Sequence, residues 1–160
     1  MKETVVKVAE WAAERGEGVL VTLGLGSCVA IMLYDAESRA GAMAHVLLPS
    51  ISLARDTSNR AKFPETAVPL LIERLKALGA DARRLSAKLA GGARMFSQLA
   101  TPGTIQMGER NVLAARSALR AAAIPIVREA VGGERGRSVR FHVKDGRVEI
   151  RSVGTDELVI

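Results

Sequence analysis

The fold of this chain depends most on residues 21–29, which read Val21-Thr22-Leu23-Gly24-Leu25-Gly26-Ser27-Cys28-Val29. An apolar run rich in β-branched residues leads into a glycine-rich turn, and the only cysteine of the chain follows that turn. Gly24 and Gly26 let the backbone turn sharply or approach another group closely. His45, one of two histidines, lies downstream in a second apolar run. This order of residues suggests Cys28 as a nucleophile and His45 as its base.

The composition predicts one globular domain covering residues 1–160, of which 48% are apolar and 25% charged. Aromatic residues make up only 3%, so the core must be built from aliphatic side chains and methionine. No apolar run reaches the roughly 20 residues that cross a bilayer, and residues 1–5 lack the apolar stretch of a signal peptide. We therefore expect a cytoplasmic protein without membrane insertion. A single cysteine excludes an internal disulfide.

The net charge of +6 favours acidic partners, which include nucleic acid, acidic protein surfaces and anionic lipid. The arginines are scattered along the chain, and the aromatic residues that stack on bases are nearly absent, which argues against nucleic acid. From charge alone, a basic surface without a specific partner is the simpler interpretation.

Two apolar runs, residues 29–34 and 40–48, flank a polar turn-like segment and predict a β-hairpin. A turn centred between Ala36 and Glu37 would place Cys28 directly opposite His45, whereas a one-residue slip would put the two on opposite faces. In an alternative interpretation, Ser27 caps a helix that begins at Cys28, where the helix dipole favours a thiolate.

The rest of the chain alternates helical and extended patterns. Residues 64–78 and 108–123 have apolar side chains at helical spacing, while residues 4–13 fit a strand and a helix equally well. Further strands are predicted at residues 18–23, 85–90 and 124–130, with a second hairpin at 138–143 and 147–153. Residues 93–107 read as irregular.

A catalytic cysteine needs a nearby base, because the thiolate is the nucleophile and the free thiol is mostly protonated at neutral pH. A third group often orients the histidine, and Thr22, before the same turn, is a candidate. The plainer alternatives are a buried cysteine acting as a small apolar residue and a histidine satisfied in the core. No dinucleotide or serine-elbow motif is present, and the spacing of Cys28, His45 and His142 does not fit a metal site. We expect His142 to be structural.

Several stretches together resemble one family, the chemoreceptor glutamine deamidases (CheD). They are residues 22–30, 41–49, 66–67, 91–96, 108–112 and 132–137. One departure is Phe63-Pro64-Glu65, where members often have Tyr-Ala-Asp. The resemblance implies an α+β fold, a layered α/β/β sandwich with mostly antiparallel sheets and two main helices, related to the deamidating cytotoxic necrotizing factor toxins.

The resemblance also implies an activity, in which glutamines on the cytoplasmic helices of chemotaxis receptors become glutamates through a thioester on Cys28. Carried over by motif, Cys28 is the nucleophile, His45 the general base and Thr22 the third member. Backbone N–H groups near Gly26 and Ser27 are the oxyanion candidates, and no cofactor or metal is needed. Glutamate methyl esters would give the same acyl-enzyme.

The implied partner is the phosphatase CheC, which binds and inhibits the deamidase in this family. Met95 and Phe96 are candidates for partner docking, although they suit a core anchor equally well. A second hypothesis is a non-catalytic module that regulates CheC or docks on receptors.

Overall fold

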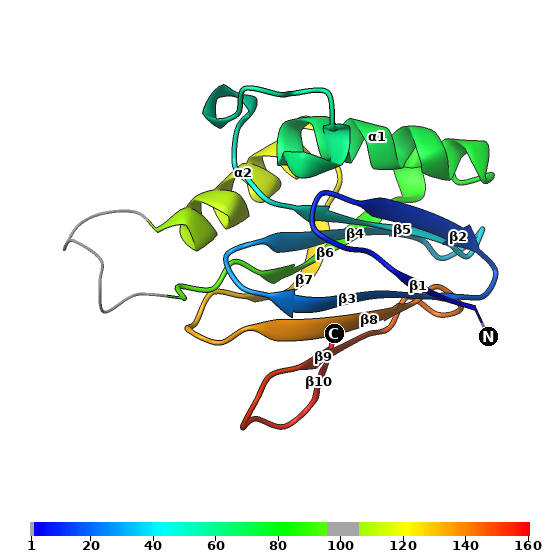
Figure 1. Ribbon diagram of the computed structural model, residues 1–160. Helices are drawn as coiled ribbons and strands as arrows, with labels where there is room; N and C mark the ends of the chain where they lie inside the picture. The colour runs from blue at the N-terminus through cyan, green and yellow to red at the C-terminus, as the bar shows by residue number, and fades with distance from the viewer. Residues whose placement is uncertain (1, 96–105) are drawn as a thin grey trace.

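The computed structural model describes residues 2–95 and 106–160, and it has three layers: two helices, then one β-sheet, then a second (Figure 1). The middle sheet has the strand order β2-β5-β4-β6-β7. Its strands are β2 (Trp11–Arg15), β5 (Ala40–Val46), β4 (Val29–Asp35), β6 (Ser86–Gly91) and β7 (Ile126–Val131). The outer sheet has the order β1-β3-β8-β9-β10. Its strands are β1 (Glu3–Val5), β3 (Val19–Leu25), β8 (Arg137–His142), β9 (Val148–Arg151) and β10 (Leu158–Val159).

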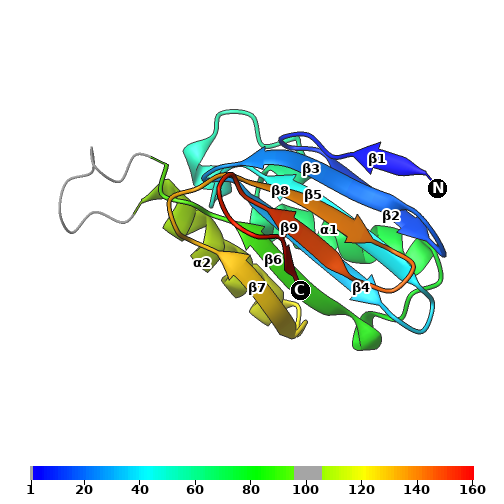
Figure 2. The same ribbon diagram turned by 90° about the horizontal axis from the view of Figure 1, so that it is seen from below.

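Both sheets are mixed. β1 pairs with β3, and β6 with β7, in parallel, whereas the other strand pairs are antiparallel. Figure 2 shows the outer sheet from the side away from the helices. The expected α+β sandwich with mostly antiparallel sheets and two main helices is therefore confirmed.

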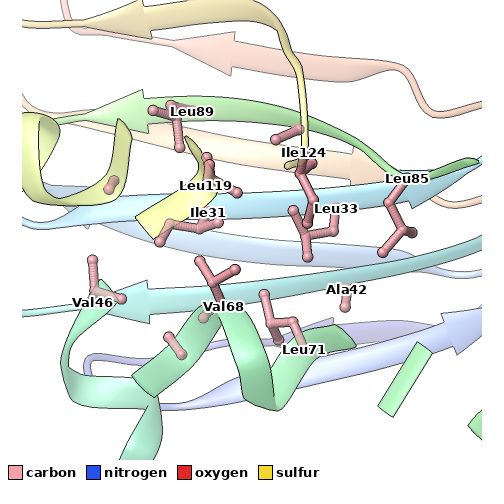
Figure 3. Packing of buried hydrophobic residues seen from close by; sticks show 14 of the residues in the cluster. Ile31, Leu33, Ala42, Val46, Val68, Leu71, Leu85, Leu89, Leu119 and Ile124 are labelled. Carbon is pink, nitrogen blue, oxygen red and sulfur yellow. The ribbon is translucent and has the colours of Figure 1, made fainter. Parts of the chain in front are cut away.

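Helices α1 (Pro64–Ala77) and α2 (Met107–Ala121) cover one face of the middle sheet. Their apolar stripes pack on side chains of β4, β5 and β6 (Figure 3). Pro64 suits the first turn of α1 because its missing N–H has no intrahelical partner there. The helices predicted at 64–78 and 108–123 are confirmed, to within two residues at each end.

A second apolar core fills the space between the two sheets. It contains Leu20 of β3, Met32 of β4, Met43 of β5 and Phe141 of β8, all nearly inaccessible to solvent. Each of these strands therefore presents alternate residues to the inter-sheet layer.

Two local predictions needed correction or resolution. Residues 4–13 form no helix but contribute to β1 and β2, one in each sheet, joined by a crossing segment. The alternative of a helix beginning at Cys28 is wrong, because β4 begins at Val29. Within the described ranges, neither helix combines the length and apolar character required to cross a membrane.

Candidate active site

Thr22 and His45 meet in the layer between the two sheets, one from each sheet. The Thr22 hydroxyl donates to the Val6 carbonyl oxygen at 2.6 Å, and its oxygen lies 2.8 Å from Nδ1 of His45. A hydroxyl has one proton, and here the Val6 carbonyl receives it. The Thr22 oxygen must therefore accept from Nδ1–H of His45, which leaves the lone pair of the imidazole on Nε2.

The segment between β1 and β2 fixes the backbone of His45. The Ala9 N–H donates to the His45 carbonyl at 2.8 Å, and the His45 N–H donates to the Glu10 carbonyl at 3.0 Å. Val6 in the same segment accepts the Thr22 hydroxyl. Residues 6–10 thus hold both members of the Thr22–His45 pair, a role that nothing in their sequence pattern indicated.

Cys28 lies where the chain passes from the outer to the middle sheet, between the end of β3 and the start of β4. Its carbonyl accepts from the Gly92 N–H at 2.8 Å, and that of Gly26 accepts from the Ala93 N–H at 2.9 Å. The fit is close, since a Cβ on Gly91 would lie 2.3 Å from the Cys28 carbonyl oxygen. The half-buried Cys28 side chain packs on the inter-sheet core.

Asn111 of α2 links the residue before Cys28 to the residue that follows β5, the strand that carries His45. Its fully buried side-chain amide donates to the Ser27 carbonyl at 2.8 Å and to the Leu47 carbonyl at 3.2 Å. Sequence reasoning assigned Asn111 no role. The sequence pattern could have indicated such a role, because Asn111 is the polar residue on the otherwise apolar buried face of α2.

The predicted direct pairing of Cys28 with His45 is wrong. The hairpin turn spans residues 36–39, with Arg39 in the left-handed region at φ 51°, and it places His45 opposite Ala30. Because the shift along β4 is two residues, Cys28 and His45 still face the same layer. Nε2 of His45 has no hydrogen-bond partner among the described residues, so no hydrogen bond joins it to the Cys28 thiol. Such contacts often form only when substrate is bound.

The electrostatics of the site favour neutral groups. Burial raises the pKa of the Cys28 thiol, and the hydrogen bond of its own backbone N–H only partly offsets this. Burial also lowers the pKa of His45, against a smaller opposite effect of the Val6 backbone. At neutral pH the resting pair is therefore a thiol and a neutral imidazole, which is a general-base arrangement rather than a preformed ion pair.

The structure describes all but one of the remaining candidate site residues. Met95 is exposed and lies against the turn, since a Cβ on Gly26 would come within 3.0 Å of its Cγ, while Phe96 falls outside the described residues. Gly26 and Ser27 lie in the turn after β3, and in the described part of the chain their N–H groups have no backbone acceptor. His142 lies in β8 and contacts Glu149 on β9. Over the same residues, no three His, Cys, Asp or Glu side chains gather as metal ligands.

Comparisons with known proteins agree with the resemblance. A family model described as CheD chemotactic sensory transduction matches residues 47–152. A chemoreceptor glutamine deamidase CheD from Thermotoga maritima is 42% identical over 153 residues, covering 96% of this chain and 94% of the relative. One from Halalkalibacterium halodurans is 44% identical over 137 residues, covering 85% of each chain. The chain therefore belongs to the CheD family.

Proposed function

We propose that this protein deamidates glutamine side chains on the cytoplasmic helices of chemoreceptors, with Cys28 as nucleophile, His45 as general base and Thr22 as the residue that positions His45. The reaction and the substrate class are those in the names of its relatives, which are called chemoreceptor glutamine deamidases. The observation that carries the assignment of residues is the chain of hydrogen bonds from His45 through Thr22 to Val6. It fixes the proton on Nδ1 and leaves a buried Nε2 that has no hydrogen-bond partner among the described residues, in the layer into which Cys28 packs.

In the first half-reaction the Cys28 thiol gives its proton to Nε2 of His45 as the sulfur attacks the glutamine side-chain carbonyl carbon. The imidazolium then donates that proton to the departing nitrogen. The C–N bond breaks, ammonia leaves, and the substrate is held as a thioester on Cys28. Because Thr22 is neutral, it orients the imidazole without stabilising its positive charge as a carboxylate would.

The second half-reaction uses the same base. Water gives a proton to Nε2 and attacks the thioester carbonyl carbon, the C–S bond breaks, and the proton passes to the sulfur. The products are glutamate and the free thiol. Backbone N–H groups near Gly26 and Ser27 hold the oxyanion of each tetrahedral intermediate, a role that suits donors in a turn that have no backbone acceptor among the described residues. Every step is performed by groups of this chain, without a cofactor.

The same acyl-enzyme forms from a glutamate methyl ester with methanol as leaving group, so hydrolysis of such esters is part of the proposal. So is regulation by CheC, with the exposed Met95 beside the Gly26 turn as a contact. A CheC contact there would cover the turn that precedes Cys28. The cytoplasm, where the receptor helices lie, is the compartment that this function requires.

Mass spectrometry of receptor cytoplasmic fragments incubated with the protein tests this function. Replacement of an amide NH₂ by OH adds about 1 Da in ordinary water and about 3 Da in water labelled with ¹⁸O, as acyl transfer to water predicts. The gain is expected at a small number of glutamines. Fragments of unchanged mass after prolonged incubation would refute the proposed activity and favour a non-catalytic binding module.

A further inference from the structure

A small cavity lies between the two sheets, at the end of β4 away from Cys28. Its volume is about 220 Å³, and its lining includes Met32, Tyr34, Ser86, Lys88, Phe141 and Gly146. Six positions of chain lead from Cys28 to Tyr34, which is about 20 Å at the rise of a β-strand. The cavity is therefore separate from the candidate active site, and the proposed reaction does not use it.

The strand register turns the lining side chains toward one another. Tyr34 of β4 pairs with Ser86 of β6, and Met32 pairs with Lys88, so these four share one face of the middle sheet. That face is the one toward the outer sheet, because Met32 belongs to the core between the sheets. Phe141 approaches it from β8, and its ring lies edge-on to that of Tyr34 with the centroids 5.9 Å apart.

The Lys88 ammonium lies where the two sheets meet at this cavity. Its Nζ donates to the Gly146 carbonyl at 2.9 Å, in the turn between β8 and β9. A Cβ on Gly146 would lie 2.7 Å from the Tyr34 ring, so the turn, the ring and the ammonium converge. An ammonium has three N–H donors, and the bond to Gly146 leaves two of them for a ligand.

This ammonium has no carboxylate partner in the part of the chain that the structure describes. Asp145 also lines the cavity, but its two carboxylate oxygens accept from the N–H and from Nη1 of Arg147, each at 3.0 Å. Burial lowers the pKa of Lys88, and Arg128, its neighbour on β7, lowers it further, while the charge of Asp145 opposes both. An anionic ligand beside Lys88 would offset the burial and the repulsion.

We propose that this cavity binds a small organic carboxylate, with the carboxylate on the Lys88 ammonium and an apolar or aromatic body against the rings of Tyr34 and Phe141. Mostly apolar walls with a few polar groups are typical of small-molecule sites. A volume of about 220 Å³ suits a ligand of one ring and one carboxylate, whereas a protein helix about 10 Å across is too wide for it. An inorganic anion would leave the apolar walls uncovered.

Benzoate is the probe for this site, and benzamide is its neutral counterpart of nearly the same shape. In titrations followed by ¹H–¹⁵N NMR, benzoate should shift the amide signals of residues 86–88, 127 and 145–146. It should bind at least about tenfold more tightly than benzamide, as expected for hydrogen bonds to a charged group. Lys88→Met should weaken benzoate binding about 10- to 100-fold and leave the affinity for benzamide nearly unchanged.

The matched control is Lys144→Met, which removes the same charge from the turn between β8 and β9 but outside the lining of the cavity. It should leave the affinity for benzoate unchanged. Because Lys88→Met also loses the bond to the Gly146 carbonyl, Val127→Phe serves as a second variant. Val127 lines the cavity from β7 and is 51% exposed, so a larger side chain there should fill the cavity and block benzoate while Lys88 keeps its charge.

Equal affinities for benzoate and benzamide would overturn the proposal, as would signal shifts confined to other parts of the chain. Benzoate binding that Val127→Phe leaves unchanged would overturn it even if Lys88→Met fails to fold. Inorganic phosphate that binds at the same residues as tightly as benzoate would refute a site for an organic carboxylate. Because binding is measured directly, these outcomes are independent of whether the protein releases ammonia from receptor fragments.

Discussion

At the scale of single residues, the proposed chemistry depends on one hydroxyl. Thr22 donates to Val6 and therefore accepts from His45, which fixes the tautomer of the imidazole. A threonine brings no negative charge, so the imidazolium gains only the smaller stabilisation given by the Val6 backbone. Burial then lowers the pKa of His45. The base is neutral at rest and receives its proton only during the reaction.

Thr22→Val should lower kcat about 10- to 100-fold, which is part of the 10²–10⁴-fold contributed by general acid–base catalysis. It should also cost about 1–3 kcal/mol of unfolding free energy, because Nδ1–H of His45 and the Val6 carbonyl lose a buried partner. Thr22→Ser keeps the hydroxyl and should retain most activity. The measurements are ammonia release and urea denaturation.

Thr66→Val is the matched control, since the Thr66 hydroxyl also donates to a carbonyl, that of Arg60 at 2.6 Å, away from Cys28. It should leave kcat unchanged. A wild-type kcat in Thr22→Val would show that Thr22 does not position the base.

The pH dependence of kcat/KM should follow the neutral form of His45. Because the pKa of His45 is lowered from its usual value near 6.5, the ascending limb should have its midpoint below 6.5, and activity should persist through neutral pH. The value of kcat/KM rises with pH because only the deprotonated Nε2 can accept the thiol proton. A midpoint above 7 would instead indicate a thiolate formed without His45.

At the scale of elements, α2 joins the two halves of the candidate site. Asn111 bonds the residue before Cys28 and a residue just beyond the strand that carries His45. The contact spans 84 residues of sequence, so no local pattern gives it. The helix thereby limits how far the Cys28 turn can move from β5.

Asn111→Asp preserves the shape of the side chain but replaces its donors with a carboxylate that faces two carbonyl oxygens. We expect a loss of about 2–4 kcal/mol of unfolding free energy, as for a buried group left without its partners. A fall in kcat is expected even at temperatures where the variant is folded.

Leu119→Ala is the control for Asn111→Asp. It removes a fully buried side chain of the same helix, at a cost of about 2–5 kcal/mol, without touching either carbonyl. Its folded form should keep the wild-type kcat. An equal fall in kcat for both variants would mean that Asn111 acts only through stability.

The elements also show which parts of the fold can be predicted from the sequence. Apolar spacing is a local property, so it located α1, α2 and the strands of both hairpins. Strand register is not a local property. The hairpin has a four-residue turn with Arg39 in the left-handed region, and the sequence pattern does not distinguish it from a turn centred one residue earlier. The observed turn therefore pairs His45 with Ala30, where the prediction paired it with Cys28. The assignment of β3 and β4 to different sheets, and the support of Thr22 by Val6, depend on tertiary contacts.

At the scale of the whole molecule, the candidate site and the ion pair of a buried carboxylate with an exposed arginine occupy opposite ends of β4. Cys28 precedes its first residue, and Asp35 is its last. The fully buried Asp35 carboxylate accepts from Nε and Nη2 of Arg84 and from the Asp81 N–H, at distances from 2.9 to 3.2 Å. These bonds hold the pKa of Asp35 well below its usual range.

Asp35→Asn should therefore reduce stability by about 1–3 kcal/mol at neutral pH, because the buried side chain loses its charge-assisted hydrogen bonds to Arg84. A lowered carboxyl pKa contributes stability above the unfolded value near 4 and loses it as pH falls below that value. The difference in urea midpoint between wild type and Asp35→Asn should shrink from pH 7 to pH 3. A constant difference would contradict this account, and kcat should be unchanged in the folded variant.

The central claim is that Cys28 forms the acyl-enzyme, and Cys28→Ala tests it most directly. Wild-type and variant proteins are incubated with the same receptor cytoplasmic fragment, and the initial rates of ammonia release are compared. The account predicts release by the wild-type protein and none above background by Cys28→Ala, with an unchanged urea midpoint to show that the variant is folded. Release by Cys28→Ala at the wild-type rate would contradict it.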